Sequence, residues 1–257
     1  MTIHYEVSGK GYPVVFLHGY GQTHGIWDKY RAKLSGRYKV ITPDLPGFGQ
    51  SDSLPYELSL DMVANSIYDC LKKLNISECI IMGHSLGGYV TLEIAKRFPN
   101  IVSHIGLIHS SALADTKEKK ESRVKAIEFI QRNGVAKFIE SFVPMLFHEN
   151  NRVQLKDTIQ SLINDGSKLE EKTLTDYMLA MHDRSDSLNF IKEFEGSILF
   201  VYGEEDSSIP LAISKSQIKF MNHPYLKNLP KTGHMGMFEE EDEVYKAISK
   251  FIEVTHK

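Results

Sequence analysis

A serine occupies the centre of a G-H-S-L-G sequence at positions 83–87. The apolar run 79–82 precedes it, and residues with helical spacing follow it. A G-x-S-x-G sequence between a strand and a helix holds its serine on a sharp, strained turn with the hydroxyl exposed. Glycines flank the serine because helix and strand approach so closely there that a Cβ would collide with backbone. Ser85 is therefore a candidate nucleophile.

A serine hydroxyl reacts only when a neighbouring base accepts its proton, and that base usually needs a carboxylate to orient it. Asp206 follows the strand-like run 198–202, and His234 follows the apolar stretch 225–229. Serine, acid and histidine in this chain order are typical of hydrolases with such a turn. We predict Ser85, His234 and Asp206 as nucleophile, general base and orienting acid.

Other residues compete for two of these roles. Glu204 and Glu205 are carboxylates adjacent to Asp206, and an acid near Asp115 would follow the strand after the serine turn. His84 neighbours the nucleophile, where a packing residue is the more common occupant than a second base. Asp206 remains our choice, because a short acid at a strand end best fits the required order.

An acyl-transfer site also needs donors for the negative charge that develops on the attacked carbonyl oxygen. The backbone N–H of Leu86, directly after the nucleophile, is one expected donor. The second should come from the glycine-containing loop 18–21, which follows the apolar run 14–17. We assign it to the backbone N–H of Tyr20, and we expect His18 to support this loop.

Large apolar side chains supply candidates for a substrate pocket. Each has an alternative role in packing: Trp27, the only tryptophan, could anchor the first helix, and the residues between 142 and 181 could form the core of their own helices. The candidate pocket residues are Trp27, Phe142, Leu146, Met178, Met181 and Met235.

The elements that position these residues alternate along the chain. Short apolar runs at 14–17, 39–42, 79–82 and 105–108 predict buried strands, and the spacing at 60–68 predicts a helix. Such alternation is typical of a parallel sheet with helices on both faces. We therefore expect an α/β fold with a doubly wound sheet.

The pattern changes near position 115. From 117 to about 190 the chain shows charged amphipathic stretches without strand alternation, before strand signals resume at 198–202 and a terminal helix follows at 244–252. We expect a core of residues 1–114 and 191–257, interrupted by a helical cap at 115–190. The charged run 117–121 is interpreted as a solvated helix face.

Composition limits the partners. The net charge of −3 results from 30 basic and 33 acidic residues, so no overall field favours nucleic acid or an anionic membrane. No apolar run approaches the length that spans a bilayer. Two isolated cysteines, Cys70 and Cys79, indicate a reduced, cytoplasmic protein, and no histidines show metal-ligand spacing. We expect no metal, and the sequence leaves open whether the protein is a monomer or a homodimer.

Five motifs in order give the chain a resemblance to the α/β-hydrolase superfamily, from about position 3 to 251. They are H-G-Y-G at 18–21, D-L-P-G-F-G-Q-S-D at 44–52, G-H-S-L-G-G at 83–88, G-E-E-D at 203–206 and G-H at 233–234. The resemblance implies a mainly parallel eight-stranded sheet, the Ser85–His234–Asp206 triad and no cofactor. Within the superfamily, the chain resembles the small capped carboxylesterases, enol-lactonases and C–C bond hydrolases. Ser85 argues against the dehalogenase and epoxide hydrolase branches, which place an aspartate there.

The residues support an ester or lactone hydrolase that acts on a small, largely apolar molecule through an acyl-enzyme. The same triad could perform C–C bond hydrolysis, lyase or perhydrolase chemistry, because function depends on the pocket rather than the fold. A ligand receptor built on the same scaffold is a third interpretation. Repeated turnover without a partner protein would distinguish an enzyme from such a receptor.

Overall fold

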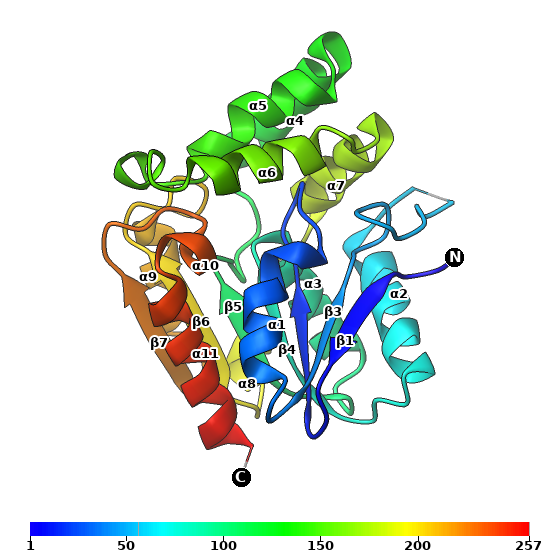
Figure 1. Cartoon of the computed structure of the whole chain (residues 1–257), viewed down its shortest axis with the longest axis vertical. Helices are drawn as coiled ribbons and strands as arrows, with labels where there is room; N and C mark the ends of the chain where they lie inside the picture. Colours follow the sequence, from blue (N-terminus) through cyan, green and yellow to red (C-terminus); the bar gives the residue numbers. More distant parts are fainter. Residues whose placement is uncertain (56, 257) are drawn as a thin grey trace.

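The computed structural model describes residues 1–55 and 57–256. In these ranges seven strands form one sheet, with the order β1-β3-β2-β4-β5-β6-β7 (Figure 1). Only β1 runs antiparallel, against β3; the other neighbouring pairs are parallel. The strands are β1 (Tyr5–Ser8), β2 (Pro13–Leu17), β3 (Lys39–Pro43), β4 (Cys79–His84), β5 (Val102–Ile108), β6 (Ile198–Gly203) and β7 (Pro224–Leu229).

The doubly wound α/β architecture agrees with the sequence prediction, but the sheet has seven strands in the described ranges rather than eight. The number eight followed from the family resemblance and not from strand-like runs in this chain. Here a single antiparallel strand, β1, forms the edge beside β3, and the chain turns through Gly9 and Gly11 directly into β2. A Cβ at Gly9 would lie 2.2 Å from two backbone oxygens, so this close turn requires glycine.

Helices cover both faces of the sheet (Figure 1). The apolar stripe of α2 is buried against α3, whereas α3 itself is buried on almost every side because it lies between α2 and strands β4 and β5. The helices outside the long insertion are α1 (Asp28–Leu34), α2 (Leu60–Lys73), α3 (Leu86–Arg97), α9 (Leu211–Ile218), α10 (Gly236–Glu239) and α11 (Glu241–Thr255), with a 3₁₀ turn at His24–Trp27.

Between β5 and β6 the chain is helical, as its pattern predicted. Helices α4 to α7 lie above the end of the sheet where the parallel strands finish, and α8 returns beside the sheet (Figure 1). We call α4–α7 the inserted helices. The elements are α4 (Lys117–Asn133), α5 (Val135–Met145), a 3₁₀ turn at Glu149–Asn151, α6 (Lys156–Gly166), α7 (Glu171–Asp183) and α8 (Leu188–Glu193).

Two features of α4 explain where it begins and ends. The Thr116 hydroxyl accepts a hydrogen bond from the Lys119 N–H at its start, and Gly134, with φ of 85°, follows its last residue.

Over the ranges that the structure describes, no helix combines the length and apolar character needed to cross a membrane.

Candidate active site

Ser85 occupies the turn between β4 and α3 with strained backbone angles, φ 51° and ψ −115°. The strain persists because the surroundings leave no alternative: a Cβ on Gly83 would lie 2.1 Å from the backbone of Gly87, and one on Gly87 would lie 2.5 Å from Leu17 O. The Ser110 hydroxyl donates to Ser85 O at 2.7 Å, which fixes the peptide after the serine. The turn therefore presents the Ser85 side chain at the start of a helix.

The structure brings together the three side chains that the sequence singled out. His234 Nε2 lies 2.9 Å from Ser85 Oγ, and His234 Nδ1 lies 2.8 Å from Asp206 Oδ2. Asp206 and His234 are almost completely buried, with exposed fractions of 4% and 3%. With its Nδ1–H donated to the carboxylate, the imidazole offers Nε2 as the acceptor for the serine proton.

The alternative acids lie elsewhere. Glu204 accepts a hydrogen bond from the Asn228 side chain, and Asp115 pairs with Arg123 and Arg184. Asp206 also has the more complete hydrogen bonding, because Oδ1 accepts the backbone N–H groups of the next turn, from Ser208 at 2.8 Å and from Ile209 at 2.9 Å. These bonds hold the carboxylate in one orientation.

A second histidine, which the sequence analysis did not consider, also bonds the Asp206 carboxylate. His109 Nδ1 lies 3.2 Å from Asp206 Oδ2, and its backbone has φ of 46° at the end of β5. A Cβ at Gly236 would lie 2.2 Å from His109 Nε2, so glycine is required there. The available sequence signal was a polar residue at the end of a buried strand, the same signal that identified Asp206.

Electrostatics keep the Asp206 carboxylate ionised. Burial alone would raise its pKa, but the charge of His234 and the hydrogen bond from His109 outweigh burial and hold the pKa well below its ordinary value. Burial lowers the pKa of His84 well below its ordinary value, and His234 and His109 add to this effect. His84 lies between Gln22 Oε1, at 3.0 Å, and His234 O, at 2.9 Å, so it supports the histidine loop.

The backbone amides of Tyr20 and Leu86 point to no partner within the described residues, since neither donates a hydrogen bond there. Unpaired N–H groups beside a nucleophile are the geometry that stabilises an oxyanion. The Tyr20 side chain connects this loop to the inserted helices, because its hydroxyl donates to Leu174 O of α7 at 3.1 Å. A second connection joins His234 N–H to Leu146 O, after α5, at 2.7 Å.

His18 braces the loop that carries Tyr20. Its Nδ1 lies 2.8 Å from Gly19 O, and its Nε2 accepts the N–H of Leu45, after β3, at 2.9 Å. These two bonds require a neutral ring with the proton on Nδ1. Consistent with this, burial lowers the pKa of His18 to about 4.

A cavity of about 330 Å³ opens beside Ser85 and His234. Four of the six predicted pocket residues line it: Phe142, Leu146, Met178 and Met181. Phe142 makes an edge contact with Tyr20, with ring centroids 5.8 Å apart, and stacks on Phe138 at 5.1 Å. The inserted helices therefore provide most of the apolar wall.

The other two predicted pocket residues are not part of this cavity. Trp27 is fully buried in the core, with its ring 5.0 Å from Phe16 and 5.4 Å from Tyr30, so the helix-anchor alternative is correct. Met235 is also fully buried, and its sulfur accepts from Gln22 Nε2 at 3.4 Å. It packs beneath the histidine loop and does not face substrate.

Several cavity residues were missed. Lys119 belongs to the charged run 117–121, which was interpreted as a solvated face, yet Lys119 lines the cavity together with Ser122, Arg123 and Ala126. The spacing of these four residues along α4 is that of one helix face. The prediction of a solvated face is therefore wrong for Lys119, and this spacing was the available signal.

Two groups of side chains in the described ranges have ligand atoms close enough to hold a metal ion. One is His109, Asp206 and His234, whose ligand atoms lie within 4.8 Å of one another. Hydrogen bonds between the two imidazoles and the carboxylate account for this proximity. The other group, with the same 4.8 Å limit, is His4, Glu6 and His24.

The strained serine turn, the histidine and the buried carboxylate at the ends of parallel strands are those of a hydrolase with an α/β fold. The family model described as alpha/beta hydrolase fold matches residues 12–241. This chain belongs to that family.

Known proteins of similar sequence include one named hydrolase and several uncharacterised proteins. The 2-hydroxy-6-oxo-6-(2'-aminophenyl)hexa-2,4-dienoic acid hydrolase of Metapseudomonas resinovorans is 22% identical over 96% of this chain and 86% of its own length. Uncharacterised proteins of Mycobacterium tuberculosis and Mycobacterium bovis are 37% identical over 42% of this chain, but the match spans only 32% of their length.

Solved structures have the same fold. An esterase from Thermogutta terrifontis superimposes with a TM-score of 0.93 at 24% identity, covering 99% of this chain and 94% of that one. An enol-lactonase from Burkholderia xenovorans gives a TM-score of 0.90 at 16% identity, covering 98% and 96%. At such identities the likeness defines the fold and leaves the substrate open.

Proposed function

We propose that this protein is a serine hydrolase that cleaves a carboxylic ester or lactone through an acyl-enzyme. The observation that carries the proposal is the hydrogen-bonded series from Ser85 Oγ through His234 to Asp206, which ends at a cavity able to hold a small molecule. The unpaired amides of Leu86, next to the serine in the chain, and of Tyr20, which lines the same cavity, support the same chemistry.

In the first half of the reaction, Ser85 Oγ bonds to the carbonyl carbon while His234 Nε2 takes the hydroxyl proton. The carbonyl oxygen becomes an oxyanion that accepts from the N–H groups of Tyr20 and Leu86. The bond to the leaving oxygen then breaks, and that oxygen takes the proton from His234. Asp206 stabilises the imidazolium that forms between these steps.

In the second half, water attacks the acyl carbon and gives a proton to His234 Nε2. The bond to Ser85 Oγ breaks, and the serine recovers the proton from the histidine. One ester and one water yield an acid and an alcohol; a lactone yields a single hydroxy acid. The buried Asp206 carboxylate, with its low pKa, remains ionised throughout.

The inserted helices serve as the cap in this proposal. They contribute Phe138, Phe142, Met178 and Met181 to the cavity wall, whereas the core contributes Ser85 and His234. We accordingly propose a core of 1–114 and 191–257 and a cap of 115–190. The cap would select a small, largely apolar substrate by shape.

Hydrolysis of a C–C bond is the second candidate, because a relative that matches nearly the whole chain is named as the hydrolase of a 2-hydroxy-6-oxo-dienoic acid, a vinylogous diketone without an ester bond. A vinylogous diketone and an enol-lactone, offered beside simple esters, separate the two. Preferential turnover of the diketone would favour the second candidate.

Replacement of the nucleophile tests the proposal. Ser85→Ala should lower hydrolysis of 4-nitrophenyl butanoate by at least about 10⁴-fold, since the triad acts as a unit. It should also abolish labelling by a fluorophosphonate probe. Ser216→Ala, an exposed serine on α9, is the matched control and should retain both. Repeated turnover by purified wild type also separates an enzyme from a receptor. Undiminished hydrolysis in Ser85→Ala would contradict the assignment.

A further inference from the structure

The cavity beside Ser85 has two kinds of wall. Its apolar part comes mainly from aromatic and sulfur-containing side chains of the inserted helices. Its polar part combines cations and hydroxyl groups, namely Lys119, Ser122, Arg123, Ser207 and Ser208. Among the described residues that line the cavity there are two cations and no carboxylate. An apolar substrate alone does not account for this polar part.

Of the two cations, Lys119 has the fewer bonding partners. Its ammonium group donates to Ser208 O at 3.3 Å, and it forms no ion pair with any described residue. Burial lowers the pKa of Lys119 and the charge of Arg123 adds to this effect, and together they outweigh the opposing influence of the Asp115 and Asp206 carboxylates. The charge of Lys119 is therefore only partly compensated within the protein, and an anion bound beside its ammonium group would stabilise it further.

Arg123 also lines the cavity, but two of its nitrogens are bonded to a carboxylate. Its Nε and Nη2 bond Asp115, while its Nη1 meets only the sulfur atoms of Met181, at 3.3 Å, and Met178, at 3.7 Å. Thioether sulfur is a weak acceptor, so Nη1 retains capacity for a stronger one. Asp115 is shared with Arg184, which leaves two guanidinium groups for one carboxylate.

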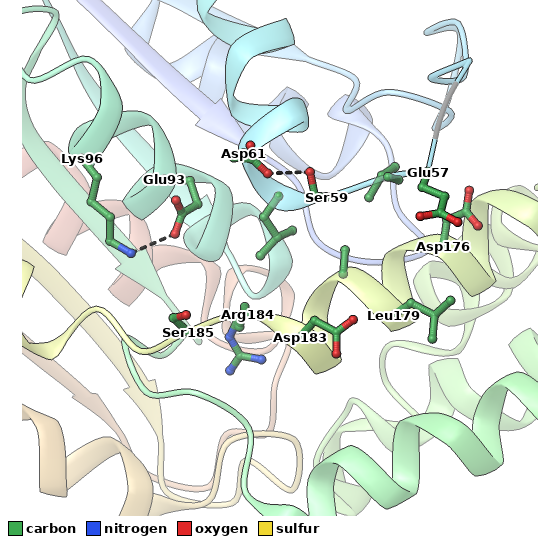
Figure 2. A pocket seen from close by; sticks show the side chains of 13 residues that line it. Glu57, Ser59, Asp61, Glu93, Lys96, Asp176, Leu179, Asp183, Arg184 and Ser185 are labelled. Atoms are coloured by element: carbon green, nitrogen blue, oxygen red, sulfur yellow. Dashed lines mark hydrogen bonds and ion pairs between the residues drawn. The ribbon is translucent and has the colours of Figure 1, made fainter.

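A second cavity shows that this charge pattern is local. The cavity of about 610 Å³ in Figure 2 lies between residues 57–61, α3 and α7, away from Ser85. Five carboxylates and two cations line it, and one of those cations, Lys96, is paired with Glu93 at 2.8 Å. In the cavity beside Ser85, by contrast, Arg123 is paired with Asp115 and Lys119 has no ion-pair partner among the described residues. Asp115 and Glu118 line an adjoining cavity that shares Lys119, so the carboxylates near this lysine lie outside the cavity of Ser85.

We propose that the natural substrate is an ester or lactone that carries a carboxylate, and that Lys119 binds this carboxylate with Arg123 Nη1 beside it. The inference rests on the proposed function, which supplies the reacting ester bond. The apolar wall would hold the carbon chain between the two groups. Lys119 is thus a specificity-determining residue that acts on substrate binding.

A purely structural role for Lys119, in which it ties α4 to Ser208 O, makes a different prediction. Loss of a structural tie would affect neutral and anionic substrates alike. A carboxylate contact would affect only the anionic one, because a hydrogen bond between charged groups is stronger than a neutral one. The relative rates of two esters matched in length therefore distinguish the roles.

The experiment compares mono-4-nitrophenyl glutarate with 4-nitrophenyl pentanoate. Wild type should prefer the glutarate, and Lys119→Met should lower the ratio of their kcat/KM values by about tenfold or more. Lys119→Arg should restore most of the ratio. Lys125→Met, the same substitution at an exposed position of α4, should leave the ratio as in wild type. An unchanged ratio in Lys119→Met would overturn the proposal.

A binding measurement separates this proposal from the proposed function. In the Ser85→Ala background, glutarate should raise the melting temperature, and glutaramide at equal concentration should not. The shift should disappear in Ser85→Ala/Lys119→Met but persist in Ser85→Ala/Lys125→Met. If neither ester is hydrolysed, the proposed function fails while this shift still supports the anion site; absence of the shift overturns the site even where esters are hydrolysed.

Discussion

The two walls of the cavity beside Ser85 are built in opposite ways. On the sheet side, short hydrogen bonds link Ser85, His234 and Asp206, and the carboxylate is bonded on both oxygens. On the helix side, Phe138 stacks on Phe142, the sulfur atoms of Met178 and Met181 contact Arg123, and Lys119 makes one hydrogen bond to a backbone oxygen. Hydrogen bonds of fixed direction therefore organise the sheet side, whereas apolar volume and charge organise the helix side.

This difference separates two tasks. Proton transfer requires atoms within hydrogen-bond reach and fixed tautomers, which only a directed network provides. Substrate selection depends on apolar volume and on the placement of a few charges. Changes on the sheet side should therefore alter the rate for every substrate, and changes on the helix side should alter the preference among substrates.

The strongest test of the sheet side is Asp206→Asn. The asparagine keeps the shape but no longer fixes the His234 tautomer, so kcat should fall by about 10⁴-fold for short and long esters alike. Steady-state kinetics with 4-nitrophenyl butanoate and octanoate would measure this. Glu205→Gln, an exposed neighbour, is the control and should retain activity. A fall in kcat for only one of the two esters would contradict the expectation that changes on the sheet side affect every substrate.

A smaller effect concerns the loop behind Tyr20. The pKa of His18 is about 4 in the folded protein, below its ordinary 6.5, so the unfolded chain binds the proton more readily between these values. The stability that depends on neutral His18 is present above about pH 6.5 and is lost as pH falls towards 4. From pH 7 to 5 the contribution to the free energy of unfolding should decrease by about 2 kcal/mol.

Urea unfolding at pH 7 and pH 5 measures this contribution. The decrease between the two pH values should be about 2 kcal/mol smaller in His18→Gln than in wild type, because the substituted side chain does not titrate. His256→Gln, at an exposed position, should show the wild-type decrease. Equal decreases in His18→Gln and wild type would contradict a buried neutral ring.

The mildest change belongs to the helix side. Phe142→Ala removes a ring that packs against Tyr20 and Phe138, which lengthens the apolar space. The ratio of kcat/KM for 4-nitrophenyl octanoate over butanoate should rise by about tenfold. Phe129→Ala, at an exposed position of α4, should leave the ratio unchanged. A fall in kcat/KM for both esters without a change in their ratio would contradict a role for Phe142 in substrate selection.

The sequence predicted the two walls unequally for a physical reason. The serine turn and the strand ends that carry Asp206 and His234 depend on local patterns, and parallel strands deliver their ends to one edge. Which face of α4 meets the cavity depends on how the insertion packs, so Lys119 was misinterpreted within a charged run. Trp27 shows the same limit, because its type suits both a core and a pocket.

His109 exposes a further limit. Its role depends on a backbone turn with φ of 46° directly after β5 and on the space that Gly236, at the start of α10, leaves for its ring. No spacing along the chain relates these positions. A second imidazole on the acid is therefore a product of tertiary packing.

Tyr20 belongs to both walls at once. Its amide faces the reacting carbonyl in the proposed mechanism, while its hydroxyl is bonded to Leu174 O of α7; His234 N–H is likewise bonded to Leu146 O. A change in the position of the inserted helices would therefore also move the loops that carry Tyr20 and His234. The fit of a substrate against the inserted helices is in this way linked to the placement of the groups that react with it.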